Sequence, residues 1–279
     1  MIGNALYILW SKSSVKEKIR VTNRKGGSGT KCMDYIASKK GDPYVLGATS
    51  GAPLNTVIRK SSVMRYEDIT FVSNLIEDPN YVSAKYDAPY NNMKELVAWA
   101  KKSGRDLNVA IGSVGGMDHI TAYRIGKETG MKLNIISFKS SGGSAVAILG
   151  GHADIRVGSY VQTMDPASKQ VKALSVNTAI RNPFLPDVLT LKEQGIDVIG
   201  AHYRGFWAPQ DFPPYAIKFW EDAFLRLSKS KGFNDYMKSG LGMPSYKTSK
   251  EMKALFDEFV NGMERDLKHL KLYEKKKKK

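Results

Sequence analysis

The stretch Asn108-Val-Ala-Ile-Gly-Ser-Val-Gly-Gly-Met-Asp-His119 decides the fold class of this chain. Residues 108–111 are expected to form a strand, residues 112–116 a glycine-rich loop, and Asp118–Thr129 a helix that Gly130 ends. Short strands alternate with helices of about ten residues along much of the chain. This alternation predicts an α/β fold with mainly parallel sheets.

Other strands and helices flank this unit. Strands are expected at 19–22, 44–48, 71–75, 81–85, 134–138, 153–157 and 171–176. Helices are expected at 30–39, 93–102, 144–149, 214–230 and from about 248 onward. Asn92 with Glu95, and Thr248 with Glu251, have the spacing of a capping box, which predicts where two of these helices begin.

The segment from 76 to 198 reads as a compact run of strand–helix units, whereas the pieces on either side look incomplete alone. We therefore expect a discontinuous first lobe, residues 1–75 and 199–279, and a second lobe, residues 76–198. Two chain crossings make a hinge, and a cleft between two lobes is where small ligands usually bind.

The composition is basic, with a net charge of +16, of which the terminal run Lys275–Lys279 supplies 5. Such a charge attracts anions of any size. The other basic residues are scattered over helical faces without interleaved aromatic residues, so nucleic-acid binding is not expected. The apolar runs are too short to cross a bilayer. The single cysteine, Cys32, excludes an intrachain disulfide.

Glycine- and serine-rich loops after strands are the candidate sites. Glycines in 112–116 expose backbone N–H groups, and the following helix start adds partial positive charge, which suits an anion. Asp118 is expected to cap that helix. Loop 47–51 carries two hydroxyls that suit a carboxylate, or it is only a turn. Lys139, in the loop 138–144, either neutralises a carboxylate or faces solvent.

Other chemistry is not favoured. The loop 23–30 fails the Walker A and Rossmann patterns, so a structural turn is the preferred interpretation. The four histidines lack zinc-ligand spacing. No nucleophile elbow, Cys/His pair or paired carboxylates are found, so we expect neither an enzyme nor a cofactor or metal site.

The same loops resemble those of the substrate-binding proteins of tripartite tricarboxylate transporters, also called Bug proteins. The ordered series of similar segments spans nearly the whole chain. In chain order it consists of Asn23–Gly29, Gly112–His119, Phe138–Ser140, Leu149–Asp154, Lys172–Val176, Arg181, Pro186–Thr190 and Phe206–Pro209.

The resemblance implies a type II periplasmic-binding-protein-like fold with two lobes, a hinge and an interlobe cleft that closes on a small di- or tricarboxylate or related organic acid. It also implies a periplasmic, monomeric receptor that delivers its ligand to membrane permease subunits. The ligand-binding residues that it implies are Thr49, Ser50 and Gly51 in the first lobe, Ser113, Gly115, Gly116, Lys139 and Ser140 in the second, and Ser159 as a further candidate.

The chain also departs from the family pattern at its N-terminus. Met1–Trp10 is apolar but lacks the basic start and cleavage site of a secretory signal. Ala5–Ser14 aligns best with the helix after the family's first strand and loop, so that strand is expected to be missing. The alternative function is therefore an N-terminally incomplete member that binds no ligand and acts, if at all, through protein contacts.

Overall fold

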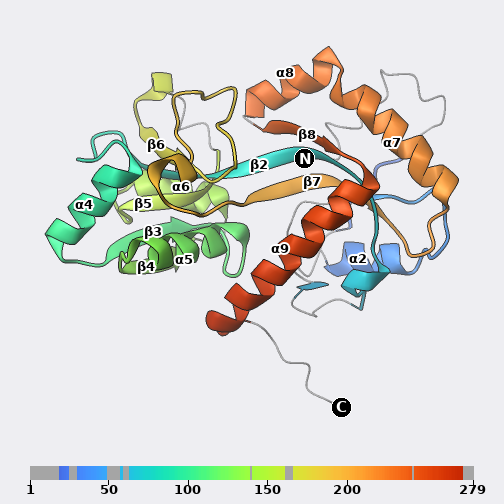
Figure 1. Cartoon of the computed structure of the whole chain (residues 1–279), viewed down its shortest axis with the longest axis horizontal. Coiled ribbons are helices and arrows are strands. Elements are labelled where there is room, and N and C mark those ends of the chain that lie inside the picture. Colours follow the sequence, from blue (N-terminus) through green and yellow to red (C-terminus); the bar gives the residue numbers. More distant parts are fainter. Residues whose placement is uncertain are drawn as a thin grey trace. The chain divides into compact units, whose positions relative to one another are not determined.

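The computed structural model describes residues 19–24, 30–48, 57–58, 63–138, 140–160, 166–240 and 242–272. Its internal contacts divide the chain into two compact units (Figure 1). Unit 1 is Met1–Glu77 with Tyr203–Lys279, and unit 2 is Asp78–His202. The chain therefore leaves unit 1 once and re-enters it once, a few residues after the two crossings that the sequence suggested.

Unit 1 combines four helices and a four-stranded sheet in the order β1-β7-β2-β8 among the described residues. β1 pairs antiparallel with β7, and β8 pairs antiparallel with β2. The elements are α2 (Thr30–Ala37), β1 (Gly47–Ala48), η2 (Tyr66–Asp68), β2 (Thr70–Lys85), β7 (Ala201–Ala208), α7 (Pro214–Ser228), α8 (Lys231–Gly240), β8 (Met243–Lys247) and α9 (Ser249–His269).

Unit 2 is built around three parallel strands in the order β5-β3-β4. The second half of β2 continues this sheet, antiparallel to both β5 and β6. The remaining elements are α4 (Met93–Ser103), β3 (Leu107–Ile111), α5 (Met117–Thr129), β4 (Leu133–Ser137), α6 (Ser141–Leu149), β5 (Ile155–Ser159), η4 (Pro166–Ser168), β6 (Val171–Val176) and η5 (Lys192–Gln194).

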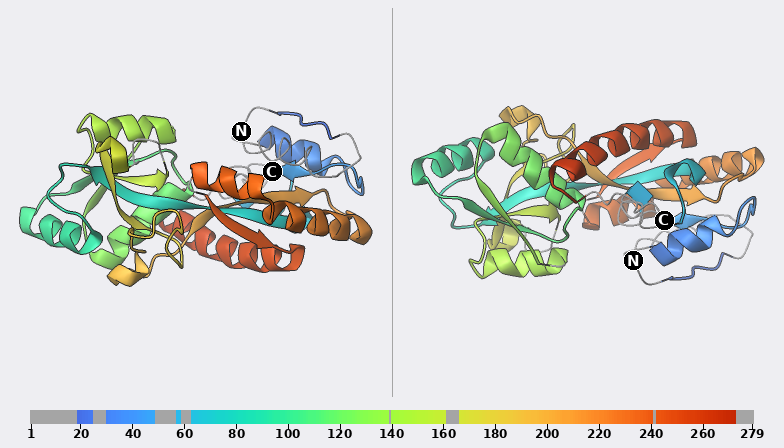
Figure 2. Two further views of the ribbon diagram at one scale, coloured as in Figure 1. Left: turned by 90° about the horizontal axis from the view of Figure 1, so that it is seen from above. Right: turned by 90° about the horizontal axis from the view of Figure 1, so that it is seen from below.

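The long strand β2 corrects two expectations. The predicted strands 71–75 and 81–85 are one strand, which runs from unit 1 into unit 2 (Figure 2). It changes partner near Pro79, pairing with β8 before this residue and with β5 and β6 after it. Because β2 is antiparallel to all three, the unit 2 sheet is mixed rather than mainly parallel, and the β1–β7 and β2–β8 pairs of unit 1 are antiparallel. Residues 19–22, expected as a strand, have no regular secondary structure.

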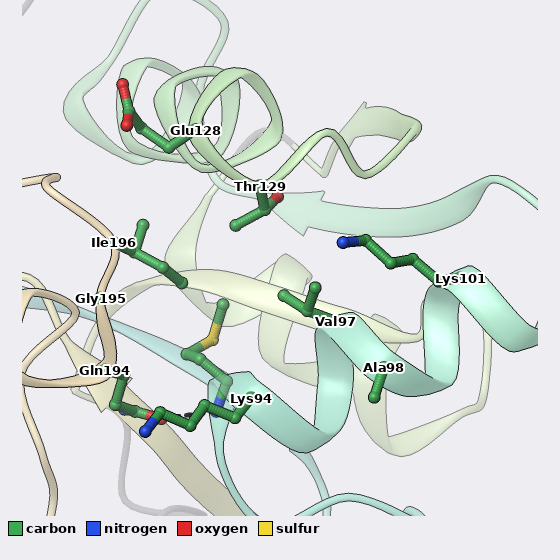
Figure 3. Close-up of a pocket in the computed structure, with 10 residues that line it drawn as sticks. Lys94, Val97, Ala98, Lys101, Glu128, Thr129, Gln194, Gly195 and Ile196 are labelled. Carbon is green, nitrogen blue, oxygen red and sulfur yellow. Dashed lines mark hydrogen bonds between the residues drawn. The ribbon is translucent and has the colours of Figure 1, made fainter.

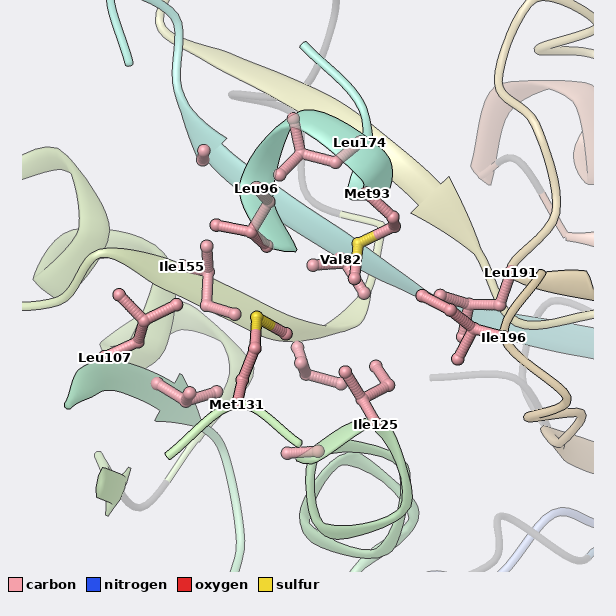
Figure 4. Packing of buried hydrophobic residues seen from close by; sticks show 14 of the residues in the cluster. Val82, Met93, Leu96, Leu107, Ile125, Met131, Ile155, Leu174, Leu191 and Ile196 are labelled. Carbon is pink, nitrogen blue, oxygen red and sulfur yellow. The ribbon is translucent and has the colours of Figure 1, made fainter. Parts of the chain in front are cut away.

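The core of unit 2 lies on both faces of its sheet because side chains of successive strand residues point to opposite faces. Val109 and Ile111 join a large cluster. The same cluster contains Ile125 of α5 and Leu96 of α4 (Figure 4). Ala110, between them, packs instead in a second cluster that includes Ala147 of α6. The sheet is thus covered by α4 and α5 on one face and by α6 on the other.

Local signals explain the helix ends. The Asn92 side chain accepts a hydrogen bond from the Glu95 N–H, and Gly104 ends α4 in a left-handed conformation. Thr248 and Glu251 form the predicted capping box at the start of α9. Of the helices in the described ranges, none combines the length and the apolar character needed to traverse a bilayer.

Candidate functional site

The parallel strands β3, β4 and β5 end at one edge of the unit 2 sheet, and the candidate loops follow them there. The loops after β3 and β4 are in contact. A Cβ atom at Gly112 would lie 3.0 Å from the backbone nitrogen of Ser141, a tight contact, so glycine favours this close approach of the two loops. The starts of α5 and α6 are therefore neighbours at this edge.

The loop before α5 is organised around the carboxylate of Asp118. The backbone N–H groups of Gly112 and Ser113 donate to Oδ2 over 2.5 and 3.0 Å, and the Ser113 hydroxyl donates to Oδ1 over 3.2 Å. The N-cap residue of α5 is Gly116, which provides no side-chain cap. Asp118 is therefore not the N-cap residue: it lies inside the first turn and binds the preceding loop. Its Oδ1 also accepts the His119 N–H over 3.0 Å, so it satisfies one backbone donor of the helix start as the sequence suggested.

His119 holds the other end of this loop. The Gly115 N–H, at a residue with φ of 74°, donates to Nδ1 of His119 over 3.0 Å. The ring nitrogen Nδ1 must then be unprotonated, which leaves the hydrogen of the neutral ring on Nε2. Burial lowers the pKa of His119, against an opposing effect of the Asp118 charge. The neutral ring is the form that this contact requires.

Both helices keep backbone donors at their starts. The first N–H groups of an α-helix have no partner within the helix. Over the described ranges, no acceptor contacts the N–H groups of Met117 and Asp118 in α5, or those of Ser141 and Gly142 in α6. Each helix start also carries a partial positive charge. Two adjacent helix starts with open donors are suited to a carboxylate or another small anion.

Hydroxyl groups of two predicted site residues lie on the same loops and strand ends. The Ser140 hydroxyl is the N-cap of α6 and accepts the Gly143 N–H over 2.9 Å, so its own hydrogen is left to donate. The Ser159 hydroxyl, at the end of β5, donates to Oδ2 of Asp78 over 3.4 Å. Asp78 thus brings a negative charge beside one edge of the site.

A groove of about 440 Å³ lies elsewhere in unit 2 (Figure 3). Its lining includes Lys94 and Lys101 of α4, Glu128 and Thr129 at the end of α5, and Gln194. Because α5 rises about 1.5 Å per residue, this groove lies about 20 Å from the loop at the start of the helix. It is therefore separate from the anion-favouring edge.

The model of the family described as the tripartite tricarboxylate transporter family receptor, TctC, matches residues 12–272. The chain belongs to this family. Its members are solute receptors rather than enzymes, so the prediction that this protein is not an enzyme is confirmed, as is the recognised resemblance.

Curated relatives cover much of the chain at low identity. The chain is 26% identical over 239 residues to the "UPF0065 protein in gbd 5′ region" of Cupriavidus necator, covering 84% of this chain and 68% of that protein. It is 24% identical over 212 residues to protein BugT of Bordetella pertussis, covering 74% of this chain and 65% of BugT.

Solved structures share the fold. A TctC solute-binding protein from Polaromonas superposes with a TM-score of 0.84 at 22% identity, covering 96% of this chain and 92% of that one. MatC from Rhodopseudomonas palustris with bound malate gives 0.75 at 18%, covering 95% and 93%. The R. palustris protein Rpa4515 with adipate gives 0.78 at 18%, covering 96% and 91%. These matches confirm the predicted α/β receptor fold.

The structure brings together some residues of the predicted receptor site. Ser113 and Ser140 lie on the two loops in contact, and Ser159 lies at the end of the neighbouring strand β5. The N–H groups of Gly115 and Gly116 are engaged within the loop, Gly116 donating to the Ser113 carbonyl over 3.4 Å. The described residues do not include Thr49, Ser50, Gly51 and Lys139, which the sequence predicted as site residues. They also do not include the N-terminal segment 1–18, so the absence of the first strand stays a prediction.

Sequence reasoning missed one residue of this receptor at the same edge, Arg156. It is the second residue of β5 and is fully buried, and its guanidinium group reaches the Ser159 carbonyl at the end of the strand. Its neighbours Ile155 and Val157 are also buried. A single charged residue in an otherwise apolar strand is therefore the sequence feature by which Arg156 could have been found. With respect to metals, no group of three or more His, Cys, Asp or Glu side chains is placed to hold an ion within the described ranges.

Proposed function

We propose that this chain is a periplasmic receptor for a small organic carboxylate, which it delivers to the membrane subunits of a tripartite transporter. The observation that carries the proposal is the meeting of the α5 and α6 starts, with open N–H groups at Met117, Asp118, Ser141 and Gly142. The family, and the malate and adipate in two similar structures, support a carboxylate as the ligand.

The proposed contacts follow from the chemistry of these groups. A carboxylate accepts several hydrogen bonds at once, and bonds from backbone N–H groups to an ionised acceptor are stronger than neutral ones. The Ser140 hydroxyl hydrogen adds a further donor. We assign Ser113 to holding the loop through Asp118, while Thr49, Ser50, Gly51, Lys139 and Ser159 remain predicted ligand residues.

A thermal-shift and calorimetric panel tests the function. Malate, adipate and citrate are added to the full chain at equal ionic strength, with choline chloride as the matched salt. A ligand that binds only the folded state stabilises it by about 2.7 kcal/mol at 100 times its Kd. We expect a rise in Tm and measurable heat with at least one acid. A folded protein that responds to none of the organic acids contradicts the proposal.

The variant Ser140→Gly tests the site itself. Glycine is tolerated at an N-cap and costs only a few tenths of a kcal/mol, so the hydroxyl is removed with little effect on α6. We expect several-fold weaker carboxylate binding with an almost unchanged Tm of the free protein. Ser239→Ala, on an exposed residue of α8 in unit 1, is the matched loss of a hydroxyl and should leave affinity unchanged.

A further inference from the structure

Arg156 is a buried cation at the edge that carries the anion-favouring loops. Its side chain is fully buried between the unit 2 sheet and α6. The Nε–H donates to the Ser144 hydroxyl over 2.9 Å, and Nη1 donates to the Ser159 carbonyl over 3.0 Å. Ser144 lies near the start of α6 and Ser159 ends β5, so the guanidinium group lies at the same end of the sheet as the candidate site.

This cation has no carboxylate bonded to it. Within the part of the chain that the structure describes, Arg156 forms no ion pair, and its buried Nη2 atom has no hydrogen-bond partner. Burial lowers the pKa of Arg156 to about 10, while the charge of Asp118 acts in the opposite direction through space. The group remains charged at neutral pH. Buried arginines are almost always paired, because an unpaired buried charge is costly.

The chain leaves room for the unpartnered atom. A Cβ atom on Gly158 would lie 2.8 Å from Nη2, so the guanidinium group lies across a residue that must lack a side chain. Gly158 is one residue before the end of β5. Nη2 is thus placed beside the strand end, where the loops after β3 and β4 also converge. A full positive charge in this position, which no bonded carboxylate of the described residues offsets, favours a negative charge nearby that the protein itself does not supply.

We propose that Arg156 is a specificity-determining residue of the carboxylate site, which selects organic acids that bring a second full negative charge to the carboxyl end of β5. This inference rests on the proposed receptor function. One carboxylate occupies the open N–H groups of the α5 and α6 starts, and a second offsets the charge of Arg156. A neutral ester or amide in the second position leaves the buried cation unpaired, and charge-assisted bonds are the stronger ones.

Calorimetry with adipate and its monomethyl ester tests the selection. The two ligands have the same chain and differ by one charge. We expect the wild-type protein to bind adipate at least about tenfold more tightly than the ester, because only the second carboxylate offsets the buried charge of Arg156. Arg156→Met should bring the ratio of the two Kd values close to one, and Arg156→Lys should retain part of it.

The control and the second variant separate this role from a structural one. Arg226→Met, at an exposed residue of α7, makes the same change in net charge and should keep the wild-type ratio. Arg156→Gln keeps a donor for Ser144 without the charge, so it replaces Arg156→Met if that variant does not unfold cooperatively. The expected result for it is the same loss of discrimination.

Two results would overturn the inference. The first is an Arg156→Met or Arg156→Gln protein that still prefers adipate as strongly as the wild type does. The second is an equal loss of affinity for both ligands, which marks a purely structural role. A wild-type protein that binds neither ligand nor any other organic acid refutes the receptor function itself, and the role of Arg156 fails with it.

Discussion

The Oδ2 atom of Asp118 lies 2.5 Å from the backbone nitrogen of Gly112, so a carboxylate of the protein itself holds the loop that precedes α5. The loop gives its Gly112 and Ser113 N–H groups to this internal anion. The donors left for a ligand are therefore those of the helix starts. The relationship makes Asp118 a determinant of the shape of this loop.

Asp118→Asn should destabilise the protein by about 2 kcal/mol, because the amide keeps one acceptor oxygen but loses the charge that strengthens several hydrogen bonds. Urea unfolding monitored by circular dichroism measures the change. Asp197→Asn, on an exposed carboxylate in unit 2, is the matched control and should stay within about 0.5 kcal/mol of the wild type. Equal stability of the two variants would show that Asp118 does not organise the loop.

His119 should titrate below the ordinary histidine pKa of 6.5, since burial disfavours its charged form. Protonation of Nδ1 also removes the acceptor of the Gly115 N–H. A group whose neutral form is favoured in the folded state costs stability as the pH falls below its unfolded pKa. The loop should therefore weaken as the pH falls below about 6.5. An NMR titration of the His119 ring measures this pKa, and a value above 6.5 contradicts the burial that the structure gives.

Glu193 should contribute stability that depends on pH. Arg181, whose guanidinium group bonds both carboxylate oxygens, and the Thr190 N–H hold the pKa of Glu193 at about 2, below the ordinary 4.5. Because the folded pKa is depressed, the contribution is complete above about pH 4.5 and is lost as the pH falls toward 2.

The variant Glu193→Gln checks this assignment. Its unfolding midpoint in urea should lie below that of the wild type at pH 7, and the gap should narrow steadily from pH 4.5 downward. Glu128→Gln, an exposed residue of α5 with the same change in charge, should show no such narrowing. If the difference in urea midpoint between the wild type and Glu193→Gln does not change with pH, the effect of the substitution does not come from the ion pair with Arg181.

Ile125→Ala should cost about 2–5 kcal/mol, because Ile125 is fully buried in the cluster between α5 and the sheet, and the truncation leaves a cavity. Ile180→Ala, at a residue 67% exposed, should change the free energy of unfolding by less than about 0.5 kcal/mol. Chemical denaturation of both variants provides the comparison. Similar losses would mean that the cluster does not support unit 2.

The sequence by itself determined the features that depend on neighbouring residues. Asn92 with Glu95, and Thr248 with Glu251, placed two helix starts, because a side chain caps a helix through residues three positions away. The spacing of Met252, Phe256 and Val260 is that of one helical face, and all three are buried in α9. The loop 112–116 was recognised as a strand-to-helix connection for the same reason.

Only the tertiary structure decided the features that join distant residues. Strand β2 became one element because Ser83 pairs with Arg156, and Glu77 with Met243, across long stretches of chain that no local pattern encodes. The same pairing placed the charge of Arg156 beneath α6, next to Ser144 and away from water. Burial and partner choice are properties of the packed chain, so the sequence predicted the receptor fold, while the structure revealed which groups at the candidate site already have partners.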